Sequence, residues 1–396
     1  MGTWHGLRVA FILGALFAIL LIIVYWDDVG GGFNLYPLRD RKHERCPQTD
    51  TVRSHPPPTL PSSFAGIPTT TWANRSLLQP GREDEKEEED EIRDSDGSQE
   101  QIARKRRISD VCSGTDFPGR TRAFEQIPNR ELDHLIVDDT HQIIYCYVPK
   151  VACTNWKRVM VVLAQSLVSP VSGKPYTDPE LVPPDVVHNS SLHLTFAKFW
   201  RHYGSLSRHL MALKLQHYTK FLFVRDPFVR LISAFRNKFG RPNEDFYRQF
   251  GSVILRRYGN LSGSLPETAA EAFASGIKPT FQQFVSYLLD EDTEKESVFN
   301  EHWRQVYRLC HPCQVKYDFI GRLETLETDA EHLLKLLQVD HLLRFPSGAR
   351  NRTAASWERD WFAQIPVSMR TELYELYRPD FELFGYPKPD SVLHHQ

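Results

Sequence analysis

Between residues 135 and 340 the chain alternates short apolar runs with amphipathic segments. Runs such as 143–148 are apolar, β-branched and aromatic, which is typical of strands buried on both faces. Other segments repeat apolar residues at spacings of three and four, which predicts helices that bury one face. We expect strands at 135–138, 143–148, 221–224 and 317–321, and helices at 155–167, 227–239, 280–289 and 330–337. This alternation predicts an α/β fold with a central parallel sheet flanked by helices, which binds ligands at the carboxyl ends of its strands.

A different pattern occupies the N-terminus. Residues 9–26 form an unbroken apolar run that is long enough for a short transmembrane helix. His5 and Arg8 precede the run and two aspartates follow it, so the positive-inside rule places residues 1–8 in the cytosol. A cleaved signal peptide is the alternative, but residues 25–28 lack the small-x-small cleavage pattern. We therefore predict a single-pass type II anchor.

The next region, residues 27–108, looks like a stem without a core. It is proline-rich near residue 57, and residues 81–100 contain 11 acids and 3 bases, a local charge of −8. We predict a largely disordered stem here and a catalytic domain at 109–396. The chain as a whole is 41% hydrophobic with a net charge of −2, and its basic residues are dispersed. That argues against a nucleic-acid partner and against a glycosaminoglycan-binding protein without enzymatic activity.

Two segments carry candidate chemistry. The first joins the strand at 143–148 to the helix at 155–167 through a tight turn, with Thr154 or Asn155 as the predicted N-cap. Backbone N–H groups in such a turn bind phosphate-like anions at the positive end of the helix dipole. It is not a nucleotide-triphosphate P-loop, because GxxxxGK[ST] is absent and Lys150 precedes the turn. On its own, this segment is equally an ordinary turn with a surface lysine.

The second segment, 220–239, repeats this order. Arg225 follows a short predicted strand, and Asp226 and Pro227 open the next helix. That helix places three polar residues on one face, namely Arg230, Ser233 and Arg236. Two neighbouring strand ends would then present an anion-binding turn and an arginine-serine pair, which suits a ligand with phosphates at both ends.

These two segments, VPKVACTNWKR and FLFVRDPFVRLISAFRNKF, resemble the 5′- and 3′-phosphosulfate-binding motifs of Golgi carbohydrate sulfotransferases. They are most similar to the chondroitin 4-O-sulfotransferase group, within a wider set that includes the HNK-1 and dermatan enzymes. The resemblance runs from about residue 127 to residue 389 and includes FNEHWRQVYRLCHPC. It implies a P-loop-like sulfotransferase fold, a Golgi membrane location with a lumenal catalytic domain, 3′-phosphoadenosine 5′-phosphosulfate as the donor, and no metal.

The resemblance also implies the reaction and the donor site. A sulfuryl group would pass to the 4-hydroxyl of N-acetylgalactosamine in chondroitin or in desulfated dermatan, and Lys150 would stabilise the leaving phosphate. The turn and the Thr154 hydroxyl would hold the 5′-phosphate, and Arg225 and Ser233 would hold the 3′-phosphate. The full candidate set is Pro149, Lys150, Val151, Ala152, Cys153, Thr154, Asn155, Arg225, Asp226, Pro227, Phe228, Val229, Arg230, Leu231, Ile232 and Ser233. Within it, Asp226 and Arg230 are also consistent with a helix cap and a surface charge.

The acceptor hydroxyl needs a base, which the sequence does not single out. We favour His188, because members of the resembled group carry a histidine about this far after the first motif. His193 and Glu301 remain alternatives. The segment 300–304, NEHWR, suits a sugar-binding wall, although Trp303 is equally consistent with a core residue.

Other functions remain open at this point. The acceptor could instead be an iduronate-rich dermatan chain or a terminal N-acetylgalactosamine on N-glycans. A metal-dependent Golgi glycosyltransferase would use a D-x-D pair, and residues 290–292 have that spacing in an acidic turn. The long double motif outweighs this three-residue match.

Four sequons predict N-glycosylation, at Asn74, Asn189, Asn260 and Asn351. The basic cluster at 104–107 fits the cleavage pattern of Golgi proprotein convertases and would release a soluble enzyme, but a solvated cluster that neutralises the acidic run fits equally well.

The cysteines suggest one local bridge. Cys310 and Cys313 form a CxxC without a second ligand pair for zinc, so we expect a disulfide between them in an oxidising compartment. Cys146 and Cys153 are expected to be packed or reduced.

Overall fold

The structure is a computed structural model that describes residues 84–118, 121–260, 263–347 and 360–394. Contacts divide the chain into Met1–Ser76 and Leu77–Gln396, and every described residue belongs to the second unit. The predicted cytosolic tail and membrane anchor therefore lie outside the described residues. Within the described part, no helix has the length and apolar character needed to cross a membrane.

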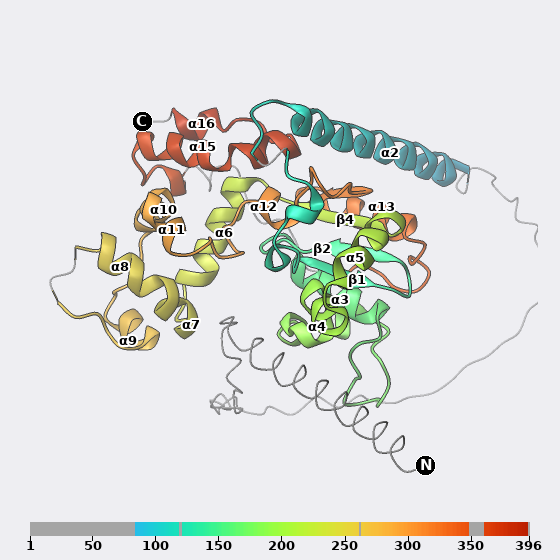
Figure 1. Ribbon diagram of the computed structural model, residues 1–396, viewed down its shortest axis with the longest axis horizontal. Coiled ribbons are helices and arrows are strands. Elements are labelled where there is room, and N and C mark those ends of the chain that lie inside the picture. Colours follow the sequence, from blue (N-terminus) through green and yellow to red (C-terminus); the bar gives the residue numbers. More distant parts are fainter. Residues whose placement is uncertain (1–83, 119–120, 261–262, 348–359, 395–396) are drawn as a thin grey trace, which may run out of the picture. The chain divides into compact units, whose positions relative to one another are not determined.

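A five-stranded sheet forms the centre of the described unit (Figure 1). Its strands are β1 (Leu135–Asp138), β2 (Ile143–Cys146), β3 (Leu194–Thr195), β4 (Thr219–Val224) and β5 (Phe319–Arg322), in the spatial order β3-β1-β2-β4-β5. The strands β2, β4 and β5 are parallel, but β1 pairs antiparallel with both β2 and β3. The prediction of a wholly parallel sheet was therefore wrong. The connection between β1 and β2 is too short for the crossover that parallel strands require.

Helices flank the sheet and extend beyond it. They are α2 (Asp84–Ser113), α3 (Cys153–Leu163), α4 (Phe196–Tyr203), α5 (Leu206–His217), α6 (Pro227–Phe239), α7 (Glu244–Phe246), α8 (Ser252–Tyr258), α9 (Ala269–Ala274), α10 (Phe281–Leu289), α11 (Glu291–Glu296), α12 (Val306–Cys310), α13 (Leu326–Leu336), α15 (Val367–Phe384) and α16 (Asp390–Leu393). The predicted helix at 227–239 is confirmed residue for residue. The helix predicted at 155–167 starts earlier and ends at Leu163, shortly before Gln165 takes a φ of 49°.

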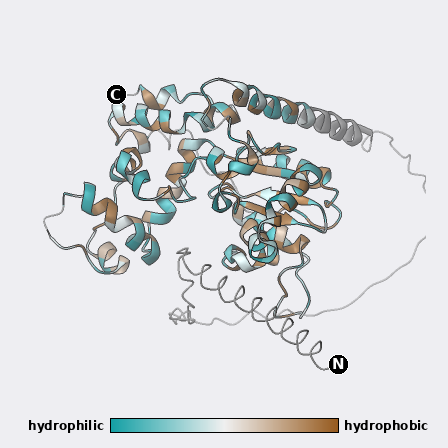
Figure 2. Cartoon of the chain, in the orientation of Figure 1, coloured by the Kyte–Doolittle hydropathy of each residue, from teal (hydrophilic) through white to brown (hydrophobic). Residues whose placement is uncertain are grey.

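Two apolar cores hold these elements. The first packs α3 and α13 against the sheet, whose strands are mostly hydrophobic in Figure 2. The second joins α6, α10 and α15 through buried aromatic residues that include Phe228, Phe284, Trp303 and Tyr377. Helix α6 follows β4 directly, so it links the sheet to the second core. The turn after β2 and the start of α6 consequently lie side by side at the carboxyl ends of two adjacent parallel strands.

Helix α2 overturns the predicted end of the stem. Gln101 pairs with both backbone groups of Ile320 on the edge strand β5, at 3.0 Å and 2.9 Å, as a neighbouring strand would. Arg104 is buried and donates to the carbonyl of Ile320 at 2.7 Å and to Asp329 at 2.8 Å. The sequence suggested otherwise because the acidic run hides a helix that is stabilised by contacts distant in sequence. The folded unit therefore begins before residue 109, and the basic cluster 104–107 lies in a docked helix.

The cysteine pairing also differs from the prediction. Cys112 is bonded to Cys313, and Cys146 is bonded to Cys310, so the predicted Cys310–Cys313 bridge was wrong. Cys146 is packed in the core, as one of its two expected states requires, but it is not reduced. Cys153 is free, as expected. The two bridges tie α2 and β2 to the segment around α12. Only the fold brings these partners together, at sequence separations of 201 and 164 residues.

Peptide mapping of the unreduced protein should recover the Cys112–Cys313 and Cys146–Cys310 pairs. Because each bridge closes a long loop, removing either one is expected to lower the free energy of unfolding by about 4 kcal/mol. Chemical denaturation of a Cys146→Ser, Cys310→Ser double variant would measure this loss. Recovery of a peptide that contains an internal Cys310–Cys313 bond would contradict the structure.

Candidate active site

The turn after β2 has an anion-binding form. Lys150 and Ala152 both take positive φ values, 73° and 50°, which turns the chain sharply into α3. The N-cap is Ala152 rather than Thr154 or Asn155, and the N–H of Asn155 bonds to the carbonyl of Ala152 at 3.0 Å. The N–H groups of Val151 and Thr154 bond to no other described residue, so they can serve a ligand, whereas that of Asn155 is already used.

The buried side chain of Arg230 supports this turn from the protein interior. It was considered a surface charge, but its side chain is buried and the structure corrects that interpretation. It donates to three backbone carbonyls: Pro149 at 3.0 Å, Glu301 at 2.8 Å and Arg304 at 2.7 Å. One guanidinium thus fixes the backbone of this turn against the segment 300–304. Arg230 serves the site through this positioning and does not face the cavity described next.

A cavity of about 870 Å³ opens beside the turn and along α6. It gathers Lys150, Arg225 and Ser233, which the sequence analysis placed in one site. Among the described residues, its lining contains five cations and no acid, the cations being Lys150, Arg225, Arg236, Arg241 and Lys278. Aromatic side chains complete the wall, namely Phe235, Phe239, Phe281 and Trp361. This size and charge suit an anionic ligand with an aromatic part.

The other candidates on α6 support the site from inside the protein. Asp226 caps the helix by accepting from the N–H groups of Phe228 and Val229 at 2.9 Å and 3.0 Å. Burial raises the pKa of this carboxyl to about 6. The side chains of Pro227, Phe228, Val229, Leu231 and Ile232 are buried, so they shape the helix rather than line the cavity.

The structure distinguishes between the two histidines that were considered as the base. His193 is buried, and its Nε2–H donates to the carbonyl of Val187 at 2.6 Å, so this histidine is structural. His188 is exposed, and its Nε2 lies 3.1 Å from the hydroxyl of Thr154, which follows the turn after β2. Burial of part of the ring, together with the nearby Lys157, lowers the pKa of His188, which keeps the imidazole neutral at pH 7. A neutral imidazole beside the loop can accept a proton.

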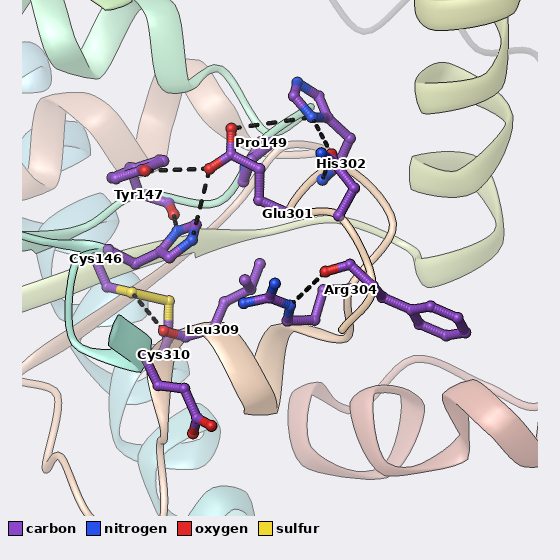
Figure 3. A network of polar contacts seen from close by, with 12 residues as sticks. Cys146, Tyr147, Pro149, Glu301, His302, Arg304, Leu309 and Cys310 are labelled. Carbon is purple, nitrogen blue, oxygen red and sulfur yellow. Dashed lines mark hydrogen bonds and ion pairs between the residues drawn. A yellow bond between two sulfur atoms is a disulfide. The ribbon is translucent and has the colours of Figure 1, made fainter. Parts of the chain in front are cut away.

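Glu301 also lies in this site. The hydroxyl of Tyr147 donates to its Oε2 at 3.1 Å, and Figure 3 shows Tyr147 and His302 on either side of the carboxylate. The neighbouring Trp303 is fully buried in the second core, which excludes it from a sugar-binding wall.

Two lysines lie near Glu301. The sequence did not single out Lys157, whereas Lys238 was expected to face solvent or the acceptor. Lys157 is buried with its amine 3.8 Å from the centre of the Tyr147 ring, and Lys238 lies 4.1 Å from the centre of the Phe246 ring. Burial lowers the pKa of both amines, and the charge of Glu301 opposes that change. Both lie inside the two long motifs, but only the fold shows that they face the same space. Glu301 is therefore a carboxylate with cationic side chains around it.

The remaining candidates have simple placements. Burial raises the pKa of the Cys153 thiol, and Lys150 donates its N–H to that sulfur, so Cys153 is a packed thiol. Asn189 and Asn260 are exposed, as a glycan requires, whereas Asn74 and Asn351 lie outside the described residues. Asp290 of the D-x-D match caps α11 by accepting from the N–H of Asp292 at 2.9 Å. That carboxylate is thus committed to a helix cap.

Known proteins match the chain over most of its length. The model of the sulfotransferase family matches residues 133–387. Carbohydrate sulfotransferase 12 from Xenopus laevis is 51% identical over 96% of this chain and 97% of its own length, and the Mus musculus protein of that name is 50% identical over 98% of both. Carbohydrate sulfotransferase 11 from Rattus norvegicus is 40% identical over 73% of this chain and 76% of its own. No solved structure matches significantly.

Proposed function

We propose that this chain, which belongs to the sulfotransferase family, transfers a sulfuryl group from 3′-phosphoadenosine 5′-phosphosulfate to the 4-hydroxyl of N-acetylgalactosamine in chondroitin. The observation that carries the donor assignment is the cavity beside the phosphate loop. Its five cations and absence of acids suit a ligand with three charged groups, and its aromatic wall suits an adenine ring. The relatives named as carbohydrate sulfotransferases support a sugar acceptor.

In the proposed complex the two phosphates of the donor bind at adjacent strand ends. The free N–H groups of the turn and the hydroxyl of Thr154 bind the 5′-phosphate, as the N-terminus of a helix commonly does. Arg225 and Ser233 bind the 3′-phosphate, since both line the same cavity as Lys150. Arg225 also donates to the carbonyl of Lys150 at 3.3 Å, which couples the two phosphate sites.

The transfer itself is an in-line displacement. The acceptor oxygen attacks sulfur, and the bond between sulfur and the bridging phosphate oxygen breaks with its electrons going to the phosphate. Lys150 stabilises the charge that develops there. His188 takes the proton of the acceptor hydroxyl on its Nε2. That nitrogen is held 3.1 Å from Thr154 in the free protein and is released when Thr154 turns to the 5′-phosphate.

The acceptor and the location are finer parts of the proposal. We favour chondroitin, with desulfated dermatan also accepted, because the double motif most resembles the chondroitin 4-O-sulfotransferase group. Iduronate-rich dermatan and terminal N-acetylgalactosamine on N-glycans are the runner-up acceptors. We place the enzyme in the Golgi membrane as a single-pass type II protein with a lumenal catalytic domain.

Sulfate transfer by the purified protein onto unsulfated chondroitin, with disaccharide analysis of the product, tests this proposal. We expect 4-sulfated N-acetylgalactosamine, and we expect His188→Ala to lower kcat by about 10²- to 10⁴-fold with unchanged donor affinity. His209→Ala is the matched control, because His209 is exposed on α5 away from the turn. Sulfation of another position or sugar would refute the acceptor assignment. Failure to bind the donor would refute the reaction.

A further inference from the structure

The carboxylate of Glu301 lies near several cationic side chains but forms no described ion pair with a lysine or an arginine. Burial lowers the pKa of Lys157, Lys238 and His188, and the charge of Glu301 opposes this fall, so all three lie within its electrostatic reach. Among the described residues, it nevertheless forms no ion pair with a lysine or an arginine, and its side chain is 36% exposed. A structural carboxylate would normally be paired or fully solvated, and Glu301 is neither. This arrangement indicates a group held ready for a ligand.

One oxygen of Glu301 is fixed and the other is open. Tyr147 donates to Oε2, and burial together with Glu301 raises the pKa of that phenol well above its usual value, so it remains a donor. His134 lies 3.6 Å from the same oxygen, but its Nδ1–H donates to the carbonyl of Tyr147 at 2.8 Å. Burial lowers the pKa of His134 to about 4, so this ring is neutral and does not cancel the charge. Oε2 is thus held in place by a rigid neighbour.

The other oxygen, Oε1, accepts no hydrogen bond from a described residue. Nδ1 of His302 lies 3.9 Å from Oε1, and its N–H donates to Asn300 at 2.7 Å instead (Figure 3). Arg230 links the backbone carbonyl of Glu301 to the turn after β2. The Cys146–Cys310 disulfide restrains the same segment nine residues after Glu301. Oε1 is therefore an accurately positioned acceptor within electrostatic reach of His188, Lys157 and Lys238.

We infer that Oε1 of Glu301 accepts a hydrogen bond from the 6-hydroxyl of the acceptor N-acetylgalactosamine and so selects sugars that are unsulfated at that position. This inference rests on the proposed function. Within chondroitin this sugar is linked through its anomeric carbon and O3, which leaves O4 and O6 free on the ring. His188 lies within electrostatic reach of both Lys150 and Glu301. A sugar ring with O4 between Lys150 and His188 would therefore lie near Glu301, and O6 is its remaining free hydroxyl.

The chemistry of this contact provides discrimination. A hydroxyl gives a carboxylate a charge-assisted hydrogen bond. A sulfate at O6 has no proton to donate and places a second negative charge beside the carboxylate. The site then loses a hydrogen bond and gains a repulsion, which is how polar sites reject the wrong substrate.

The test compares kcat and KM on unsulfated chondroitin and on 6-sulfated chondroitin, at saturating donor, for the wild type, Glu301→Gln and Glu301→Ala. We expect the wild type to favour the unsulfated acceptor at least about tenfold in kcat/KM, and Glu301→Gln to reduce that preference to roughly threefold or less. Glu301→Ala should raise KM for unsulfated chondroitin about tenfold with little change in kcat. Glu131→Gln is the matched control, because Glu131 pairs with Arg122 on another surface.

Three outcomes would overturn the inference. If Glu301→Gln lowered kcat on both acceptors at unchanged KM, Glu301 would be the proton acceptor instead. If Glu301→Ala raised KM equally for both acceptors, the carboxylate would not distinguish a hydroxyl from a sulfate at position 6 of the sugar. No transfer to chondroitin by the wild type would refute the proposed function and this inference together. Donor affinity, measured by calorimetry, should be the same in all variants.

Discussion

Lys150→Ala is expected to lower the kcat of sulfate transfer by about 10²- to 10³-fold while the domain stays folded. In the proposed reaction this amine stabilises the charge that develops on the leaving phosphate, and it lines the cavity beside the turn with Arg225. The backbone should be unaffected, because alanine at a φ of 73° has the same steric restriction as lysine. Transfer assays, with thermal unfolding as a check on folding, measure the effect. A loss smaller than about fivefold would remove Lys150 from the chemistry.

The ionisation of Lys150 gives a second readout. Burial lowers the pKa of its amine to about 8 in the free protein, and nearby Lys238 and Arg225 add to this while Cys153 opposes it. The amine is therefore charged below about pH 8 and loses its proton as the pH rises through that value. We expect kcat/KM for the donor to fall above pH 8 in the wild type, and this alkaline limb to be absent in Lys150→Ala. An identical limb in both proteins would assign it to another group.

The fold was predictable where local signals were strong. Asp226 and Pro227 define the start of α6, and buried strands precede both motifs, so these elements appeared at or near their observed positions. The antiparallel strand β1 was found but misoriented, since its own residues look the same in either direction. Strand β3, with two residues, has no periodicity to detect. Local sequence patterns therefore predicted the helices and strands. The connections between the strands determined their directions in the sheet.

The candidate site also has a part that could be predicted from the sequence and a part that could not. Lys150, Arg225 and Ser233 could be grouped because two parallel strands end side by side. The sequence could not show that Arg230 points inward to three carbonyls, or that His193 is buried while His188 is exposed. Both facts depend on packing between segments far apart in the chain. The cysteine pairing was hidden for the same reason, since the chain has six cysteines, which allow 15 complete pairings.

Deleting the chain up to residue 107 is expected to prevent stable folding of the catalytic domain, whereas a fragment that begins at residue 84 should fold. The deletion removes the amide of Gln101 that pairs with Ile320 and the guanidinium of Arg104 that pairs with Asp329. The edge of β5 would be left open, and the largely buried Asp329 would lose its cation. Secretion yield and cooperative thermal unfolding of the two fragments provide the measurement. Cleavage within 104–107 would then inactivate the enzyme rather than release it in active form.

A pair of point variants on the same helix isolates the cause. Arg104→Ala should lower the free energy of unfolding by about 3 kcal/mol or more, because removing one partner leaves a buried charge uncompensated. Arg106→Ala should change it by less than about 0.5 kcal/mol, since its side chain is 81% exposed and its pair with Asp110 is solvated. Denaturant unfolding of both variants settles the comparison, because helix propensity changes equally in the two. If Arg104→Ala were no more destabilising than Arg106→Ala, the contacts of Arg104 would not hold α2 on the domain, and the folded unit would begin after the basic cluster as its sequence first suggested.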